Sequence, residues 1–366
     1  METITIGLNH KTAPVGLRER IAFSQAKLPE AYSILDNLSS IQESLILSTC
    51  NRVEIYGVTD NPERGILELK RFLSKYHKLD LKEFEEKLYA YQGRDAVYHL
   101  FNVASGLDSM VIGETQILGQ LKTTYRNGRR DKSVGMILEA LLQKSFFVAK
   151  EVRTSTNITK GAVSVGSAAV KLAEEKLGDL FGRKIIVIGA GKVSELVIKY
   201  LKSRQASSLV VGNRTYEKAR ELAQKFDSEA INFNRLSEFL VDADILISST
   251  SAPHFIIRKE DIAKVMRERR NKPLLLIDLA VPRDVEPEVA ELESVYIYDI
   301  DSLQKVVEKN VYLRQKEIDI CDRIIQKQVD EFMRWSDQRK RVEGNPNGVY
   351  GNDEAYSTFG CVGVDA

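Results

Sequence analysis

Cys50 is the most promising candidate for a catalytic nucleophile in this sequence. It ends a short apolar run and is followed by Asn51 and Arg52, in the stretch LILSTCNRVEIYGV. An adjacent guanidinium and a turn that points backbone N–H groups at the sulfur both favour the thiolate, which is a strong nucleophile. Most cysteines outside disulfides are buried and inert, so the alternative is that Cys50 is a small core residue.

A second chemical motif lies in the stretch IIVIGAGKVSELVIKYL, between an apolar strand and a helix. Its turn consists of Gly189, Ala190, Gly191, Lys192, Val193 and Ser194. The first glycine permits the tight turn, and the second lets the backbone approach a pyrophosphate at the helix N-terminus. The third position is usually Gly or Ala, and Ser194 is small enough to serve there, although it weakens the match. Because four more strands alternate with helices after it, the motif predicts a dinucleotide site rather than a simple glycine-rich turn.

The end of the next predicted strand indicates which dinucleotide would bind. NAD enzymes usually place a carboxylate here for the ribose 2′-hydroxyl, but this chain has Asn213, Arg214 and Thr215 after Gly212. A cation and a hydroxyl suit a 2′-phosphate. The sequence therefore favours NADPH, with a solvated surface role as the alternative for Arg214.

The elements that must position these residues fall into two patterns. Predicted strands at 3–9, 43–49 and 52–58, with helices at 28–38 and 62–76, indicate an α+β unit with an antiparallel sheet. Residues 94–157 follow a helical pattern, and a helix at about 163–177 leads into a doubly wound α/β unit. The strands of that unit are predicted at 184–189, 208–213, 244–250, 273–279 and 295–300.

The fold class expected is α/β multidomain. We predict an N-terminal α+β catalytic domain at 1–157, a Rossmann domain at 158–301, a long helix at 302–340 and a flexible tail at 341–366. The helix has a narrow apolar seam, formed by Val307, Val311, Ile318, Cys321, Ile325 and Phe332. Such a seam is expected either to pack back on the same chain or to form an oligomerisation spine, and periodicity alone favours neither.

Composition excludes several functional classes. The 366 residues are 43% hydrophobic and 29% charged, which is typical of a globular protein. A net charge of +1 gives no global attraction to a polyanion, so nucleic-acid binding would need local patches. The three cysteines are too far apart to indicate a disulfide framework or a zinc site, and no metal is expected. With neither a signal peptide nor a membrane span in the pattern, we expect a cytoplasmic, reduced protein.

A nucleophilic cysteine followed by an NADP domain resembles glutamyl-tRNA reductase, the first enzyme of tetrapyrrole (porphyrin) biosynthesis from glutamate. The matching segments are GLNHKTAPVGLRER, LSTCNRVEIY, GLDSMVIGETQILGQLK, VIGAGKVSEL, GNRT and LIDLAVPRD. They cover roughly residues 3–335 in order. The STCNR and GETQILGQ segments are specific to this family, whereas the Rossmann segment alone is not.

The resemblance implies that Cys50 is the nucleophile and that His99 assists proton transfer, although a histidine beside an apolar helix face is more often structural. It also implies a set of substrate-binding residues, namely Thr49, Asn51, Arg52, Ser109, Glu114, Thr115, Gln116 and Gln120. As a hypothesis, Glu114 takes the glutamyl α-ammonium and Arg52 takes the γ-carboxylate. The alternative for Glu114 is a carboxylate that meets a helix dipole. Other matching positions, with roles that could be wholly structural, are His10, Arg18 and Glu19.

The implied mechanism has two steps. The Cys50 thiolate attacks the ester that links glutamate to the tRNA 3′ end, and the tRNA leaves a glutamyl thioester behind. Hydride from NADPH then reduces the thioester, and glutamate-1-semialdehyde is released. Backbone N–H groups near Cys50 are candidates for stabilising the oxyanion. Because the nucleophile and the nicotinamide belong to different predicted domains, we expect the second domain to swing.

The implied partners are glutamyl-tRNA(Glu), a second copy of the chain in a homodimer through the C-terminal helix, and glutamate-1-semialdehyde aminomutase. The stretch LKTTYRNGRRDK is a candidate tRNA contact, and a solvated helix end explains its charges equally well. Its basic residues are Lys122, Arg126, Arg129, Arg130 and Lys132.

Three features depart from the family pattern. Val53 replaces an expected threonine, and Lys192-Val193-Ser194 replaces a more usual Glu-Met-Gly. The sequence from about residue 344 does not resemble the family's dimerisation domain, which puts a stable dimer in doubt. Two alternative functions remain: a shikimate-dehydrogenase-like NADP oxidoreductase, which needs no cysteine, and a non-catalytic tRNA- or NADP-binding regulator, against which Cys50 and the GETQ segment argue.

Overall fold

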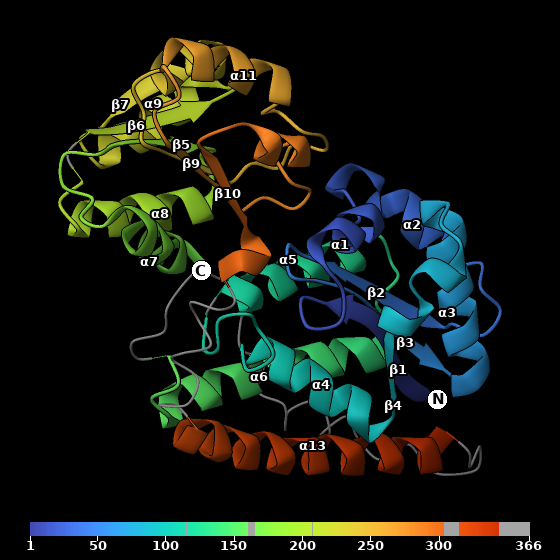
Figure 1. Cartoon of the computed structure of the whole chain (residues 1–366). Coiled ribbons are helices and arrows are strands. Elements are labelled where there is room, and N and C mark those ends of the chain that lie inside the picture. The colour runs from blue at the N-terminus through green and yellow to red at the C-terminus, as the bar shows by residue number, and fades with distance from the viewer. Residues whose placement is uncertain (115, 160–164, 207, 304–314, 344–366) are drawn as a thin grey trace. The chain divides into compact units, whose positions relative to one another are not determined.

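The computed structural model describes residues 1–114, 116–159, 165–206, 208–303 and 315–343 (Figure 1). The chain forms two compact units. The first consists of residues 1–13, 21–162 and 311–366, and the second of residues 14–20 and 163–310. The functional domain boundaries drawn from the sequence stay predictions.

The first unit is built on an antiparallel sheet with the strand order β2-β3-β1-β4. Three of its strands confirm the sequence predictions: β1 (Glu2–Asn9), β2 (Glu43–Ser48) and β3 (Arg52–Thr59). Both β1 and β3 are rich in isoleucine, valine and threonine, whose branched side chains pack well on a pleated sheet. The prediction missed β4 (Tyr89–Gln92), because four residues give too short an alternation to recognise.

Helices cover both faces of this sheet. On one face lie α2 (Leu28–Leu35) and α3 (Pro62–His77), which confirm the two predicted helices. The start of α3 follows from its sequence, because the Asn61 side chain accepts the backbone N–H of Arg64 at 3.1 Å and a proline occupies the first turn. The other face carries α4 (Arg94–Ala104), α5 (Gln116–Arg130) and α6 (Met136–Ser155).

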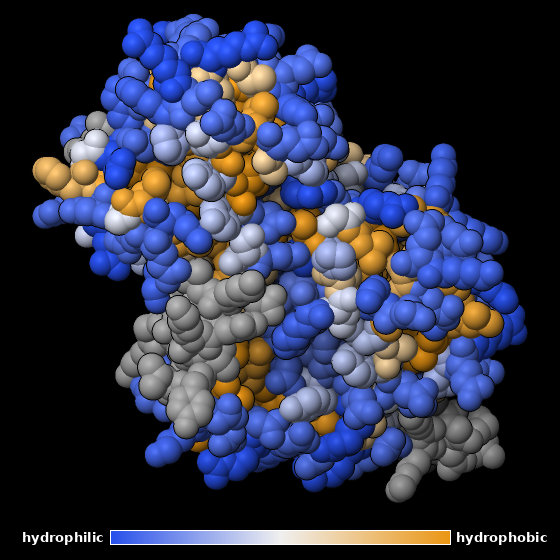
Figure 2. All heavy atoms as spheres, viewed as in Figure 1, coloured by the Kyte–Doolittle hydropathy of each residue, from blue (hydrophilic) through white to orange (hydrophobic). Residues whose placement is uncertain are grey.

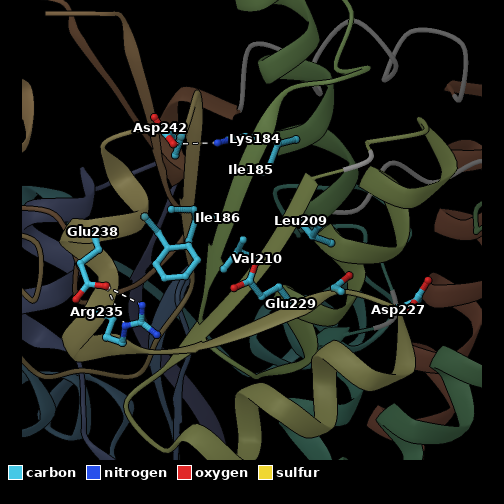
Figure 3. A pocket seen from close by; sticks show the side chains of 13 residues that line it. Lys184, Ile185, Ile186, Leu209, Val210, Asp227, Glu229, Arg235, Glu238 and Asp242 are labelled. Atoms are coloured by element: carbon cyan, nitrogen blue, oxygen red, sulfur yellow. Dashed lines mark hydrogen bonds and ion pairs between the residues drawn. The ribbon is translucent and has the colours of Figure 1, made fainter. Parts of the chain in front are cut away.

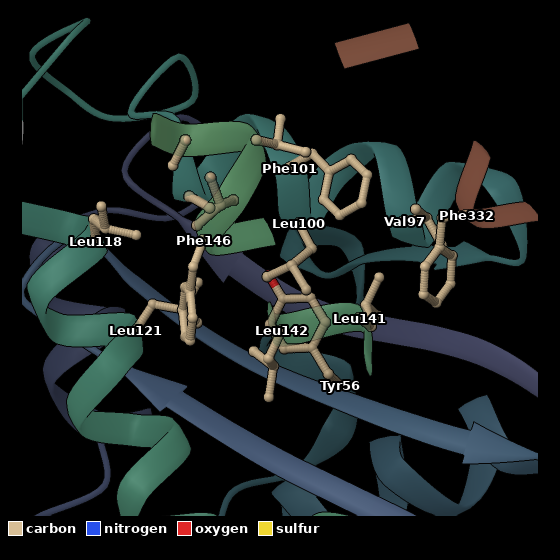
Figure 4. Packing of buried hydrophobic residues seen from close by; sticks show 14 of the residues in the cluster. Tyr56, Val97, Leu100, Phe101, Leu118, Leu121, Leu141, Leu142, Phe146 and Phe332 are labelled. Atoms are coloured by element: carbon tan, nitrogen blue, oxygen red, sulfur yellow. The ribbon is translucent and has the colours of Figure 1, made fainter. Parts of the chain in front are cut away.

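The long helix α13 (Gln315–Glu343) completes the core of the first unit (Figure 4). Its seam residues Cys321, Ile325, Val329 and Phe332 are all buried and pack against α4 and α6. The rings of Phe101 on α4 and Phe332 meet edge to face with centroids 6.4 Å apart. The seam spacing of three and four residues is that of one helix face, as predicted.

This packing shows what covers the apolar seam of the helix, because the described seam residues are buried by their own chain. A homodimer through this helix stays a prediction. The described helix also begins later and ends later than the predicted range 302–340. Residues 304–314, which include Val307 and Val311, and the predicted tail from 344 onward lie outside the described residues.

The second unit contains a six-stranded parallel sheet with the order β10-β9-β8-β5-β6-β7. Its strands are β5 (Lys184–Ile188), β6 (Ser208–Asn213), β7 (Glu229–Asn232), β8 (Ile245–Ser248), β9 (Leu274–Asp278) and β10 (Val295–Asp299). This is the 3-2-1-4-5-6 order of a doubly wound dinucleotide-binding fold, and the predicted fold class is confirmed. Only β7 was missed, because its four residues include one buried side chain, Ile231.

The helices of the second unit connect and cover these strands. They are α7 (Val165–Leu177), α8 (Lys192–Ser203), α9 (Tyr216–Lys225), α10 (Leu236–Leu240) and α11 (Lys259–Glu268). Most of α1 (Val15–Ile21) also belongs to this unit, although it lies near the start of the sequence. The short 3-10 helix η6 (Ile300–Leu303) follows β10.

Hydrophilic residues cover most of the visible face of each unit in Figure 2. Among the described residues, each helix is too short or too polar to cross a membrane. The same residues contain no group of three or more His, Cys, Asp or Glu side chains placed to hold a metal ion.

We predict that Phe332→Ala lowers the free energy of unfolding of the first unit by about 3–5 kcal/mol, because it leaves a cavity in a close-packed core. Urea denaturation monitored by circular dichroism measures the change. The control is Arg334→Ala, an exposed position of the same helix, where a change within about 0.5 kcal/mol is expected. Equal effects of the two substitutions would contradict the packing of α13 on the first unit.

Candidate active site

Cys50 lies half-buried in the three-residue turn that joins β2 to β3. Thr49 builds this turn. Its backbone N–H donates to the carbonyl of Arg52 at 2.9 Å, and its hydroxyl oxygen accepts the N–H groups of Asn51 and Arg52, each at 3.2 Å. These two N–H groups are therefore committed to the turn, and the expectation that backbone donors beside Cys50 stabilise an oxyanion does not extend to them.

The Cys50 turn is also held from outside. The backbone N–H of His10 donates to the carbonyl of Asn51 at 2.9 Å, and that of Phe23 donates to the hydroxyl of Ser48 at 3.0 Å. The Asn51 side chain is buried, and its Oδ1 has no hydrogen-bond partner among the described residues. Asn51 thus offers a desolvated acceptor beside the thiol, which suits a substrate N–H donor.

Arg52 lies beneath the turn, with 1% of its side chain exposed. Nη1 donates to a carboxylate oxygen of Glu54 at 2.7 Å and to one of Asp108 at 3.0 Å, and Nη2 donates to the backbone carbonyl of Asp108. The hypothesis that Arg52 takes a substrate carboxylate stays a prediction, and in this geometry the carboxylate would first have to displace a partner that Arg52 already has. Both terminal nitrogens already have oxygen partners, because a buried guanidinium must be paired.

Glu54 is the fully buried centre of this cluster. It accepts from Arg52, from the hydroxyls of Tyr56 and Tyr89 at 2.5 Å each, and from Nε2 of His99 at 2.8 Å. Burial alone would raise the pKa of Glu54, but the charges of Arg52 and His99 and its hydrogen bonds outweigh burial and hold the pKa well below its usual value.

The neighbouring strand makes room for this carboxylate. Gly7 of β1 stands opposite Glu54 in the register. A Cβ at Gly7 would lie 2.7 Å from the Glu54 Cγ and 2.6 Å from the backbone oxygen of Val53. A side chain at position 7 would therefore displace the carboxylate on which the cluster is built.

His99 is fixed by the same cluster. Its ring lies 4.8 Å from the ring of Tyr91 and 5.3 Å from that of Tyr89, measured between centroids. Because an ionised carboxylate only accepts hydrogen bonds, the Nε2 that faces Glu54 carries a proton. The predicted part of His99 in proton transfer stays a prediction, and the geometry adds that its ring orientation is set by Glu54.

Asp108 ties a loop from the helical layer to the end of β1. Its carboxylate accepts from Lys11 Nζ at 2.5 Å and from Asn9 Nδ2 at 3.2 Å, besides Arg52. Burial alone would raise the pKa of Asp108, but the charges of Arg52 and Lys11 outweigh it and lower the pKa.

Two glycines shape the loop that runs from Gly106 through Asp108 to Glu114. Gly106 and Gly113 have φ angles of +74° and +84°, which side-chain-bearing residues rarely adopt. A Cβ at Gly106 would lie 2.6 Å from the backbone oxygen of Glu114, and one at Gly113 would lie 2.3 Å from that of Ile158. Only glycine therefore lets the loop close tightly enough to bring Glu114 in.

Glu114 and Ser109 face Arg52 from this loop. Burial raises the pKa of Glu114 to about 7, while a hydrogen bond from Ser109 and the charge of Arg52 oppose the shift. The structure thus places Ser109 and Arg52 near Glu114, although Arg52 is far from the other two in the sequence, and their role in substrate binding stays a prediction. A carboxyl group with this pKa is poised to receive a cation near neutral pH.

The other predicted substrate residues are less closely placed. Gln116 is half-buried at the start of α5, and Gln120 is exposed one turn later on the same face. Among the described residues, neither has a hydrogen bond to the Arg52 cluster. Thr115 lies outside the described residues.

The turn after β5 in the second unit has the geometry of a dinucleotide site. Gly189 has a φ of +112°, and a Cβ there would lie 2.3 Å from the backbone oxygen of Ser249 on the adjacent strand end. Gly191 precedes α8 with open space in front of it, and no side chain caps the first N–H groups of that helix. Such uncapped amides are what a pyrophosphate binds. Ser194 is fully buried against Gly189, which is the packing role of the third fingerprint position.

The end of β6 fits a 2′-phosphate. The Asn213 side chain accepts the N–H of Thr215 at 2.9 Å, which leaves Arg214 and Thr215 exposed at the edge of the sheet. Lys192 is exposed and Val193 half-buried at the start of α8. The residues present therefore suit a nicotinamide dinucleotide, and the preference for NADPH through Arg214 stays a prediction.

A cavity of about 620 Å³ in the second unit lies elsewhere (Figure 3). It is lined by Lys184 at the amino end of β5 and by Asp242 before β8, whereas the glycine turn follows the carboxyl end of β5. Four of its charged side chains form two ion pairs, Lys184 with Asp242 at 3.0 Å and Arg235 with Glu238 at 2.8 Å. Dinucleotides bind at the carboxyl ends of parallel strands, so this cavity is not the cofactor site.

Comparison with known proteins shows the family to which this chain belongs. Residues 6–156 match the family model described as Glutamyl-tRNAGlu reductase, N-terminal domain, and residues 171–306 match Shikimate / quinate 5-dehydrogenase. A glutamyl-tRNA reductase from Geotalea daltonii is 46% identical over 335 residues, which is 92% of this chain and 77% of that relative. One from Geobacter sulfurreducens is 45% identical with the same coverage. The chain belongs to the glutamyl-tRNA reductase family.

A solved structure of the family gives the same result. Glutamyl-tRNA reductase from Methanopyrus kandleri is 34% identical, with a TM-score of 0.51 over 93% of this chain and 82% of that chain. The shikimate dehydrogenase match covers the second unit only, so it describes the dinucleotide-binding half of a family member rather than the whole chain.

Sequence reasoning missed four residues of the cluster: Glu54, Tyr56, Tyr89 and Asp108. The signal for Glu54 was present, because a carboxylate inside the otherwise apolar run RVEIYGV must be paired when the strand is buried. Tyr89 gave no such signal, since its contribution depends on β4 lying beside β1.

We predict that Glu114 makes stability fall as the pH rises from about 4.5 to about 7. Its pKa is raised from 4.5 to about 7 by burial, so in this window the folded chain binds a proton that the unfolded chain has lost. Glu114→Gln should therefore flatten the decline in the free energy of unfolding, measured by urea denaturation at several pH values. The control Glu63→Gln, at an exposed position of α3, should keep the wild-type pH dependence, and an equal flattening there would refute the assignment.

Proposed function

We propose that this protein reduces the glutamyl group of glutamyl-tRNA(Glu) to glutamate-1-semialdehyde with NADPH, through a thioester on Cys50. This reaction is the first step of tetrapyrrole biosynthesis from glutamate. The observation that supports it best is the half-buried Cys50 thiol above the Arg52–Glu54–Asp108 cluster, in a chain that also holds a dinucleotide-binding unit.

Cys50 performs the first step as a nucleophile. Its sulfur attacks the ester carbonyl carbon, a C–S bond forms, the C–O bond to the tRNA ribose breaks, and the ribose oxygen takes a proton. The positive charge of the buried Arg52 is balanced by the carboxylates of Glu54 and Asp108, so the expected effect of this guanidinium on the thiol stays a prediction. His99, held by Glu54, is the group that we assign to proton transfer.

The substrate pocket distinguishes the two ends of the glutamyl group. Glu114, with Ser109 beside it, receives the α-ammonium, and the unpartnered Oδ1 of Asn51 offers a further acceptor. The γ-carboxylate reaches the Arg52 guanidinium only by exchanging with the Asp108 carboxylate, which now occupies Nη1. Thr49 holds the turn, and Thr115, Gln116 and Gln120 are proposed to border the pocket.

The second unit would hold the cofactor by its backbone and one cation. The N–H groups after Gly191 would bind the pyrophosphate, with Ala190, Lys192 and Val193 around it, and Arg214 with Asn213 and Thr215 would bind the 2′-phosphate. When bound there, NADPH supplies the hydride that the thioester requires. The sulfur of Cys50 then leaves as the product aldehyde is released.

The partners and location proposed follow from this substrate. The exposed end of α5, with Arg126, Arg129 and Arg130, is the candidate tRNA contact, although Arg130 already pairs with Asp131 at 2.8 Å. Charged tRNA and a reduced thiol both belong to the cytoplasm, where we place the protein. A homodimer and contact with glutamate-1-semialdehyde aminomutase stay predictions.

We predict that glutamyl-tRNA labelled in glutamate leaves a covalent glutamyl adduct on Cys50 when NADPH is omitted. Cys50→Ser should abolish the adduct and lower semialdehyde formation by roughly 1,000-fold or more, because the nucleophile is lost. Acid quench followed by peptide mass spectrometry detects the adduct. Cys321→Ser, at the buried thiol of α13, should leave it unchanged. Semialdehyde formed by Cys50→Ser at the wild-type rate would rule out the mechanism.

A separate prediction concerns the choice of cofactor. Arg214→Ala should raise the KM for NADPH by about tenfold and leave that for NADH unchanged, because only NADPH carries the 2′-phosphate. Steady-state kinetics with both cofactors measures this. Arg220→Ala, an exposed arginine on α9, is the matched control. A parallel loss with both cofactors would mean that Arg214 does not recognise the phosphate.

A further inference from the structure

The segment Pro14–Arg20 belongs to the second unit, although the residues on both sides of it belong to the first. Its flanks hold the Cys50 turn from both sides. Before the segment, the backbone N–H of His10 donates to Asn51, one residue after Cys50. After the segment, that of Phe23 donates to Ser48, two residues before Cys50. The chain thus runs from the Cys50 turn into the second unit and back again.

Within the second unit, the segment is fixed by a bidentate ion pair. The Glu19 carboxylate accepts three hydrogen bonds from Arg283: from Nη2 at 2.7 Å, from Nε at 3.2 Å and from the backbone N–H at 3.1 Å. The two side chains are only 13% and 23% exposed. A partly buried, bidentate arginine–carboxylate pair is stronger and more directional than an exposed one.

A second ion pair holds the same segment. Arg18 is fully buried, and its Nη2 donates to Asp301 at 2.7 Å. The other oxygen of Asp301 accepts the backbone N–H of Val15 at 2.9 Å, at the start of α1. Asp301 therefore contacts α1 twice, at the backbone of Val15 in the first turn and at the side chain of Arg18 one turn later.

The partners of these pairs lie at the carboxyl ends of the parallel strands. Arg283 is in the loop after β9, whose shape is held by Asp278 through the N–H groups of Ala280 and Val285 at 3.0 and 2.9 Å. Asp284, next to Arg283, accepts the hydroxyl of Thr250 at 2.5 Å. Asp301 lies in η6, directly after β10. In this fold the nicotinamide binds at that edge of the sheet.

We propose that Pro14–Arg20 is a coupling segment, which aligns the nicotinamide edge of the second unit with the thioester on Cys50 for hydride transfer. Glu19 and Arg18 act in it as positioning residues. The proposal rests on the proposed function, because it concerns the second step of that reaction. It assigns these two ion pairs a role in reduction of the thioester and none in its formation.

Two isosteric substitutions test the coupling segment. Glu19→Gln removes the charge that pairs with Arg283, and Asp301→Asn removes the charge that pairs with Arg18. Both keep the shape of the side chain. If one variant does not fold, the other still tests the proposal. The matched controls are Glu291→Gln and Asp242→Asn, which break exposed ion pairs of the same unit with Lys259 and Lys184. Thermal unfolding confirms that each variant is folded.

Three quantities are measured on the full chain. The first is the rate at which labelled glutamyl-tRNA forms the Cys50 adduct without NADPH. The second is the single-turnover rate at which NADPH reduces that preformed adduct, and the third is the dissociation constant for NADPH. In Glu19→Gln and Asp301→Asn we expect reduction to slow by roughly tenfold or more, because small misplacements of reacting atoms are costly. Adduct formation and NADPH affinity should match the wild type, as should all three quantities in the controls.

Reduction of the adduct at the wild-type rate in both variants would overturn the proposal. A decrease in the rate of adduct formation as large as the decrease in the rate of reduction would overturn it too. The latter would mean that the ion pairs only maintain the fold. Exchange of the two charges, in Glu19→Arg combined with Arg283→Glu, should restore reduction in part, and no recovery would mean that the ion pair itself is not required for reduction. Failure of the proposed function would appear in the wild-type chain, which would then form no adduct at all.

Discussion

The carboxylate of Glu54, buried inside a strand, is the constraint on which the candidate active site depends. A buried charge is tolerated only when it is paired and hydrogen-bonded, and Glu54 accepts four hydrogen bonds from Arg52, Tyr56, Tyr89 and His99. Each donor is thereby fixed in place. Arg52 in turn fixes Asp108 and the loop that carries Glu114, so that residues separated widely in the sequence surround the Cys50 turn.

Each of the two units supplies a different part of what the proposed reaction needs. The first provides a cysteine in a short turn and a buried cluster of alternating charge beside it. The second provides a helix N-terminus with open backbone in front of Gly191, where a pyrophosphate can approach. Glycines occupy the positions where this matters, because Gly7, Gly113 and Gly189 each stand where a Cβ would collide with backbone or with the central carboxylate.

Much of the fold could be predicted because its elements are long and periodic. The parallel strands of the second unit are continuous apolar runs, and α3 begins at a recognisable cap. The missed strands β4 and β7 have four residues each and depend on pairing with distant partners. The role of α13 could not be predicted either. Its seam shows that one face is buried but not by what, and only the packing of Phe332 against Phe101 identifies the partner as the same chain.

The sequence by itself determined the chemistry that is available: a cysteine beside an arginine, a Gly-x-Gly turn between strand and helix, and a strand end without a carboxylate. Local spacing suffices for these features, because each lies within a few consecutive residues. The tertiary structure alone decided what Arg52 contacts. The sequence alone suggests that the guanidinium of Arg52 binds a substrate carboxylate. In the structure, its partners are the carboxylates of Glu54 and of Asp108, which lies 56 residues after Arg52 in the sequence. Pairing between buried charges depends on distance in space, which spacing in the sequence does not give.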